Sequence, residues 1–125
     1  MIKNILIVGF GSFFGGISRY LLSKYVQGSI ISTFPYPTFV VNIVGCFIIG
    51  LIFGISQKGT LLSAELKLLL AVGFCGGFTT FSTFANENLA LIKDGNFFFF
   101  TIYSTLSVFL GILSTYLGVL LTKII

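Results

Sequence analysis

The chain has 125 residues, of which 56% are hydrophobic and only 8% are charged. Soluble domains are about 45–50% apolar and about 25% charged, so a soluble protein of this length would lack the charges needed to cover its surface. The sequence contains no histidine, which removes the commonest general base and the commonest metal ligand. We therefore expect a protein that lies in a lipid bilayer.

The net charge of +4 comes from lysines that stand singly at the ends of apolar stretches. A nucleic-acid-binding protein would cluster these charges on one face, so we expect anionic lipid headgroups as their partners and no nucleic acid. Cys46 and Cys75 both lie inside apolar stretches. We expect them to pack as small hydrophobic side chains.

Four stretches are long and apolar enough to cross a bilayer, which takes about 20 residues per helix. They cover about residues 5–26, 37–56, 66–92 and 97–122. The connections hold Pro35, Gly59, Gly95 and most of the charged residues, as loops do. The sequence thus predicts an all-α membrane protein with a single domain, residues 1–125, and four transmembrane helices.

The first span contains a glycine pattern, Gly9, Gly11 and Gly15–Gly16, that imitates a dinucleotide-binding loop. No βαβ pattern surrounds it, so close helix packing is the better interpretation. Other small residues also recur four apart, and a unit this small has little interior, so we expect an oligomer. The pairs are Gly11 and Gly15, Ser12 and Gly16, Gly50 and Gly54, and Gly73 and Gly77.

Two polar side chains lie within the first two spans, where they are costly. Arg19 either snorkels to the lipid interface or serves a function, attracting anions to a vestibule or holding a dimer contact. Asn42 either joins helices or offers its NH₂ group to something that passes through. Glu87, near the end of the third span, is expected to face a vestibule.

The third span carries the strongest signal, the segment GFCGGFTTFSTF at residues 73–84. Glycine and β-branched threonine both weaken a helix, so we predict a break at mid-membrane. Such breaks are tolerated only inside protein or beside a polar cavity, and transporters use them to bind ions. Phe81 and Phe84 share a face; they either pack in the core or turn positive ring edges toward an anion.

In the fourth span, Tyr103, Ser107 and Gly111 follow one another at intervals of four residues and share one face. Helix-joining hydrogen bonds and a hydroxyl-lined track explain this stripe equally well. Across all spans, the buried polar groups are overwhelmingly amides and hydroxyls, with Arg19 as the one intramembrane charge and without a carboxylate relay or a nucleophile–base pair. A passive path for an anion is therefore favoured over a proton-coupled pump or an enzyme.

Two other classes of protein remain as alternatives. A small multidrug exporter also has four short helices, but it needs a carboxylate in its first helix, and this first span has none. A non-transporting assembly subunit would explain the glycines as packing residues. It leaves the helix-weakening residues of the third span without a purpose.

Three motifs resemble the Fluc (CrcB) family of fluoride channels. They are GGISRY at residues 15–20, TFVVNIVG at residues 38–45 and GFCGGFTTFSTF at residues 73–84. The chain length, the number of spans and the order of loops also agree with that family. Phe78 departs from it, because family members often carry a smaller aliphatic residue there.

The resemblance implies a fold and a function. Two copies would insert in opposite orientations (dual topology) and form an antiparallel homodimer with two fluoride pores. They would export fluoride passively from the cytoplasm across the bacterial inner membrane and so reduce its toxicity. The weak charge bias allows either orientation. One side has Lys3, Lys58, Lys67 and Lys123, and the other has Lys24 and Lys93.

The resemblance also implies roles for particular residues. The expected fluoride-contacting residues are Asn42, Phe81, Phe84, Thr38, Ser82, Tyr103 and Ser107, with Arg19 and Glu87 at the vestibules. In the family, a structural sodium ion lies at the centre of the dimer, on main-chain carbonyls. Those carbonyls correspond to Gly76 and Thr79 here.

Overall fold

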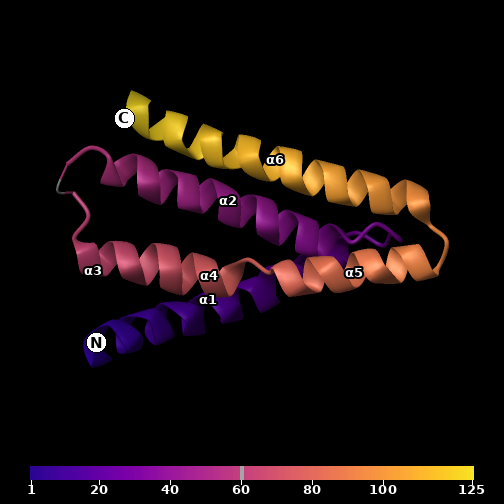
Figure 1. Ribbon diagram of the computed structural model, residues 1–125, viewed down its shortest axis with the longest axis horizontal. Coiled ribbons are helices and arrows are strands. Elements are labelled where there is room, and N and C mark those ends of the chain that lie inside the picture. Colours follow the sequence, from indigo (N-terminus) through magenta and orange to yellow (C-terminus); the bar gives the residue numbers. More distant parts are fainter. Residues whose placement is uncertain (60) are drawn as a thin grey trace.

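The computed structural model describes residues 1–59 and 61–125, and all regular structure within them is helical. Three uninterrupted helices are α1 (Ile2–Ser29), α2 (Tyr36–Ser56) and α6 (Phe97–Ile124) (Figure 1). The remaining segment runs from Ala64 to Lys93 and consists of α3 (Ala64–Lys67), η1 (Leu68–Cys75), α4 (Gly76–Phe78) and α5 (Phe81–Lys93). Four helical segments are long and apolar enough to cross a membrane, which confirms the four predicted spans.

Side-chain caps fix the starts of the third segment and of α6, and the first of them explains a difference from the predicted boundaries. Ser63 Oγ accepts a hydrogen bond from Leu66 N at 3.1 Å, so the third segment begins at Ala64 and not at residue 66. Asn96 Oδ1 accepts from Phe99 N at 3.2 Å at the start of α6. Such caps satisfy amides that have no partner within the helix.

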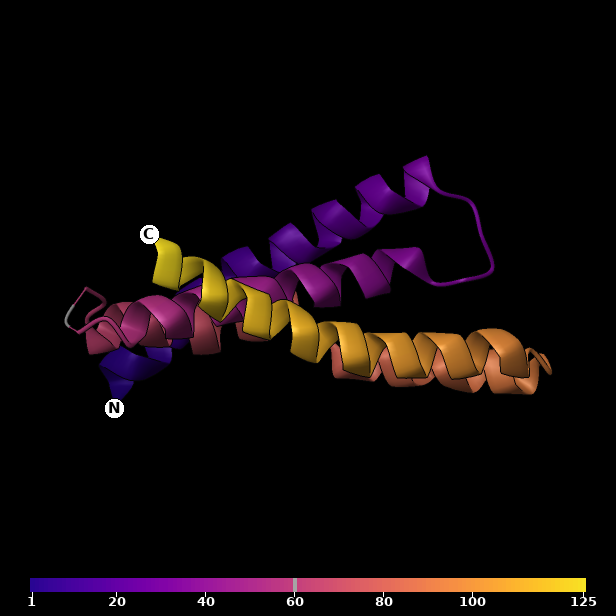
Figure 2. The same ribbon diagram turned by 90° about the horizontal axis from the view of Figure 1, so that it is seen from above.

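The helices pack as neighbours along the length of the molecule. α2 lies along α6, and α1 crosses the third segment at η1 and α4 (Figure 1). Viewed from above, α5 lies against α6, whereas the second half of α1 diverges from both of them (Figure 2). The break between α4 and α5 therefore lies where α1, α2 and the third segment meet.

Glycines allow α1 and the third segment to approach closely. A Cβ atom on Gly11 would lie 2.9 Å from Phe74 N, and one on Gly77 would lie 2.7 Å from Ser12 O. Real side chains do not tolerate these distances, so only glycine permits this backbone contact.

Glycines also allow α2 and α6 to approach closely, because Gly50 faces Thr115 and Gly54 faces Thr122. These contacts confirm that the small residues spaced four apart are packing residues. Gly16 is an exception, because a Cβ atom there would meet nothing within 4 Å in the described chain.

Large apolar side chains remain exposed on the outer faces of the helices. Phe13 of α1 and Phe109 of α6 are each 62% exposed. Surfaces of this kind suit acyl chains or a second copy of the protein. The chain is therefore a multi-pass membrane protein by the length, composition and exposed surface of its helices.

We predict that Gly11→Ala will destabilise the protein and that Gly9→Ala will not. The added methyl group on Gly11 would force α1 away from η1, at a cost of about 1–3 kcal/mol. Gly9 lies on the same helix with nothing within 4 Å of its would-be Cβ, so it is the matched control. Thermal unfolding in detergent, followed by circular dichroism, measures both. Equal midpoints for the two variants would contradict the packing role of Gly11.

Candidate functional site

The third membrane segment breaks midway along its length. α4 ends at Phe78 and α5 begins at Phe81. Between them, Thr79 (φ −85°, ψ 158°) and Thr80 (φ −148°, ψ 117°) are extended. The predicted break in the third segment is confirmed, and it falls within residues 73–84, where the glycines and threonines predicted it.

The turns before the break form a π-helix, η1, in which each amide bonds to the carbonyl five residues earlier. This widened helix was not predicted, because the apolar run LLLAVGFC fits an α-helix equally well. Such turns recur at functional sites in other proteins. Here the π-helix leads directly into α4 and the break.

Side chains bond to three of the backbone groups that the break releases. Thr80 N, which a continuous helix would direct to Gly76 O, donates instead to Asn42 Oδ1 at 2.8 Å. Asn42 Nδ2 returns a bond to Thr80 O at 3.1 Å. On the other side, Thr83 N donates to Thr80 Oγ1 at 3.2 Å and so caps α5.

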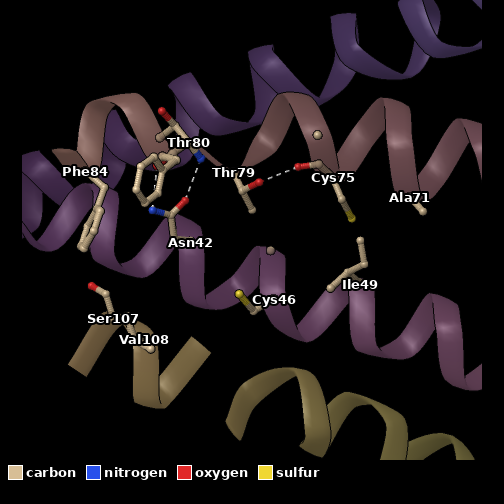
Figure 3. A pocket seen from close by; sticks show the side chains of 13 residues that line it. Asn42, Cys46, Ile49, Ala71, Cys75, Thr79, Thr80, Phe84, Ser107 and Val108 are labelled. Carbon is tan, nitrogen blue, oxygen red and sulfur yellow. Dashed lines mark hydrogen bonds between the residues drawn. The ribbon is translucent and has the colours of Figure 1, made fainter. Parts of the chain in front are cut away.

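Asn42 therefore joins α2 to the break, which is one of the two interpretations that the sequence left open. Figure 3 shows its amide on the side of the break that also carries Phe84 and Ser107. Its contact with a passing ion stays a prediction.

Arg19 reaches the break from α1. Its Nε donates to Gly77 O at 3.2 Å, at the C-terminal end of α4. A cation at the C-terminal end of a helix is stabilised by the helix dipole. The arginine thus caps the half-helix with its Nε, and its vestibule role stays a prediction.

An open pocket of about 380 Å³ lies beside the break, between α2, η1, α5 and α6 (Figure 3). It brings together six of the predicted site residues. These are Asn42, Gly76, Thr79, Phe81, Phe84 and Ser107. The lining contains no charged side chain among the described residues. The lining is mostly apolar, and a few neutral polar groups, among them those of Asn42 and Ser107, lie in it beside the aromatic rings.

Two observations characterise the polar and aromatic walls of this pocket. In the described part of the chain, Ser107 Oγ is buried without a hydrogen-bond partner. The rings of Phe81 and Phe84 have centroids 5.7 Å apart, and Phe81 is 78% exposed. An unpaired hydroxyl and an exposed aromatic ring are both unfavourable unless something else contacts them.

Five of the predicted site residues lie outside the pocket lining: Thr38, Ser82, Tyr103, Arg19 and Glu87. Three of these form a separate cluster. The Glu87 carboxylate accepts hydrogen bonds from Thr38 Oγ1 at 2.9 Å and from Tyr103 OH at 2.7 Å. Ser82 is exposed near Thr80, with the two hydroxyl oxygens 3.5 Å apart.

Phe84 connects the pocket with the Glu87 cluster. Its ring meets that of Tyr103 edge to face, with the centroids 4.9 Å apart. Tyr103 itself is fully buried. The face of α6 that carries Tyr103 and Ser107 therefore touches both groups of predicted residues.

Asn88 is a site neighbour that the sequence reasoning did not name. It is buried, donates to Phe84 O at 3.1 Å and accepts from Ser104 Oγ at 3.1 Å. Tyr103 bonds to Glu87, and the next residue on each helix, Ser104 and Asn88, forms a second bond. Two adjacent hydrogen bonds therefore join α5 to α6. The sequence held only a weak signal for it, because Asn86 and Asn88 both flank Glu87.

Known proteins resemble the chain over almost its whole length. The family model described as CrcB-like protein, Camphor Resistance (CrcB), matches residues 6–119. The protein named Fluoride-specific ion channel FluC from Flavobacterium psychrophilum is 42% identical, over 97% of this chain and 98% of its own. Its namesake from Chlorobium phaeobacteroides is 46% identical, over 96% and 93% of the two chains. These relatives are named as channels and not as enzymes, and this chain belongs to the CrcB family.

Proposed function

We propose that this protein is a fluoride-selective channel that lets fluoride leave the cytoplasm passively across the bacterial inner membrane. The names of its relatives support fluoride as the ion. The observation that carries the proposal is the broken third segment beside an uncharged, mostly apolar pocket that holds a few neutral donors and two aromatic rings. Breaks of this kind form ion sites in membrane transporters.

The pocket chemistry suits a small anion that must lose its water and then move on. Bare anions lose tens of kcal/mol of hydration in hydrocarbon, so donors must replace the water. Asn42 would supply an N–H, Ser107 an O–H, and Phe81 and Phe84 the positive edges of their rings. Neutral donors hold an anion more weakly than a lysine or arginine would, which favours release.

The Glu87 cluster would continue this path toward one end of the bundle. The hydroxyl groups of Thr38 and Tyr103 donate to the carboxylate, which reduces its repulsion of an approaching anion. Ser82, exposed at the start of α5, would add a further hydroxyl on the other side. Glu87 would thus act at the vestibule at that end, and we propose a vestibule role for Arg19 as well, in addition to its bond to Gly77 O.

The proposed assembly is an antiparallel homodimer with two pores, each built from both copies. The pocket beside the break is open on one side, and Phe81, which borders it, is largely exposed in the single chain. A second copy would cover such a surface. The bias of the lysines, four at one end of the helices and two at the other, is weak and allows insertion in both orientations.

We further propose a structural sodium ion at the centre of this dimer, on the carbonyls of Gly76 and Thr79. The residues fit such an ion. The break directs the usual helical donors of both carbonyls elsewhere, since Thr80 N bonds to Asn42 and Thr83 N bonds to Thr80 Oγ1. Unwound carbonyls hold sodium in other membrane proteins, and a two-fold axis would supply them from both copies.

Purified protein in liposomes is expected to release fluoride rapidly and chloride hardly at all. Ion-selective electrodes measure both effluxes from the same preparation, with protein-free liposomes as the baseline. Equal release of the two anions would reject selectivity, and release of neither would reject the channel.

We predict that Phe81→Ile will reduce fluoride efflux about tenfold, because aliphatic carbon lacks the positive edge of a ring. Phe98→Ile is the matched control, since Phe98 is exposed at the start of α6 and does not line the pocket. Both variants should remain dimeric on size-exclusion chromatography. Wild-type efflux in the Phe81 variant would remove this ring from the path.

Replacing Ser107 with alanine should separate conduction from stability. Because Ser107 Oγ has no partner in the described chain, its loss should leave the unfolding midpoint unchanged or higher, while efflux falls about 10-fold or more. Ser114 is the matched control on the same helix: its Oγ donates to Ile43 O at 3.0 Å, so Ser114→Ala should cost about 1 kcal/mol of stability. Unchanged efflux in the Ser107 variant would contradict its role in the path.

A further inference from the structure

The Asn42 side chain and one backbone residue of the break form a closed pair of hydrogen bonds. Oδ1 accepts from Thr80 N at 2.8 Å, and Nδ2 donates to Thr80 O at 3.1 Å. One end of the amide must accept and the other must donate, so the pair allows a single orientation of the amide plane. The side chain is therefore held on two points, as a strand residue is held by its neighbour.

This pairing requires an extended backbone at Thr80. In an α-helix, the N–H and C=O of one residue point in opposite directions along the axis, so no single amide can meet both. In an extended residue, both groups point to the same side. Thr80 has φ −148° and ψ 117°, which lets its N–H and C=O meet the one amide of Asn42. A continuous third helix would lose this pair.

The paired amide still has a donor to spare. A carboxamide carries two N–H groups, and within the described residues Nδ2 donates to Thr80 O alone. The second N–H lies in the same fixed plane. Asn42 lines the pocket together with Phe81, Phe84 and Ser107, so this N–H is held at the wall of that pocket.

We propose that Thr80 is a positioning residue, whose extended backbone clamps the Asn42 amide so that its remaining N–H donates to an anion in the pocket. The inference rests on the proposed channel function, which supplies the anion. A donor that is fixed before the ion arrives costs no reorganisation when the ion binds. The break thus has a task in the pore in addition to releasing the carbonyls of Gly76 and Thr79.

The clamp is tested by hydrogen exchange at the Thr80 amide, measured by NMR on the ¹⁵N-threonine-labelled protein in detergent. We expect Asn42→Ala to speed exchange at Thr80 about tenfold or more, because it removes the acceptor of that N–H. Asn88→Ala is the matched control, since Asn88 bonds to Phe84 O and Ser104 and does not touch Thr80. Equal exchange in wild type and Asn42→Ala would overturn the clamp.

Asn42→Asp separates clamping from donation to the ion. At neutral pH the carboxylate can still accept from Thr80 N, but it has no proton for Thr80 O and repels that carbonyl, so protection of the Thr80 amide should fall below the wild-type level. At acidic pH the carboxylic acid can donate to Thr80 O and accept from Thr80 N, so protection, corrected for the pH dependence of exchange, should return. Its single proton is then used, so fluoride efflux should stay low at both pH values.

The outcomes distinguish this inference from the proposed function. Wild-type protein that protects the Thr80 amide but releases no fluoride from liposomes would reject the channel and leave the clamp standing. Full efflux through Asn42→Asp at acidic pH, above protein-free liposomes at the same pH, would overturn the role of the second N–H. Absence of acid-restored protection in that variant would overturn the two-point clamp.

Discussion

A bilayer offers no water to a broken helix, so every backbone group released at Thr79 and Thr80 needs a partner from the protein. Three side chains from three different elements meet this need. Asn42 of α2 pairs with Thr80, Arg19 of α1 bonds to Gly77 O, and the Thr80 hydroxyl caps α5. These bonds stabilise the break, and they leave the carbonyls of Gly76 and Thr79 without their usual helical donors.

Close packing of the helices makes these side-chain contacts reachable. Gly11, Gly15 and Gly77 let α1 and the third segment approach to backbone contact, which brings Arg19 to the end of α4. Gly45 lies against Thr79 and Phe78, one turn after Asn42 on α2. The small residues of the motifs therefore set the spacing between the helices. At that spacing, the polar residues of the motifs reach the break.

Much of this arrangement was predictable from the sequence, because length and hydropathy determine membrane spans, and clustered glycines and threonines weaken a helix. The pairing of Asn42 with Thr80 was not, since it depends on how α2 packs against the third segment. The π-helix η1 could not be predicted, because its run of apolar residues fits an α-helix equally well. The role of Asn88 could not be predicted either, because its bond to Ser104 depends on the packing of α5 against α6. Fluoride could be chosen among the anions only from the resemblance of the motifs to the CrcB family, and not from the composition of the chain.

The central claim is that the third segment is interrupted at mid-membrane and that the Asn42 amide forms two hydrogen bonds with Thr80 at the interruption. A high-resolution experimental structure of the protein in lipid nanodiscs tests it most directly. The account predicts extended backbone density at Thr79 and Thr80, with the Asn42 amide against Thr80. A continuous third helix, with the carbonyls of Gly76 and Thr79 in ordinary helical hydrogen bonds, would contradict it.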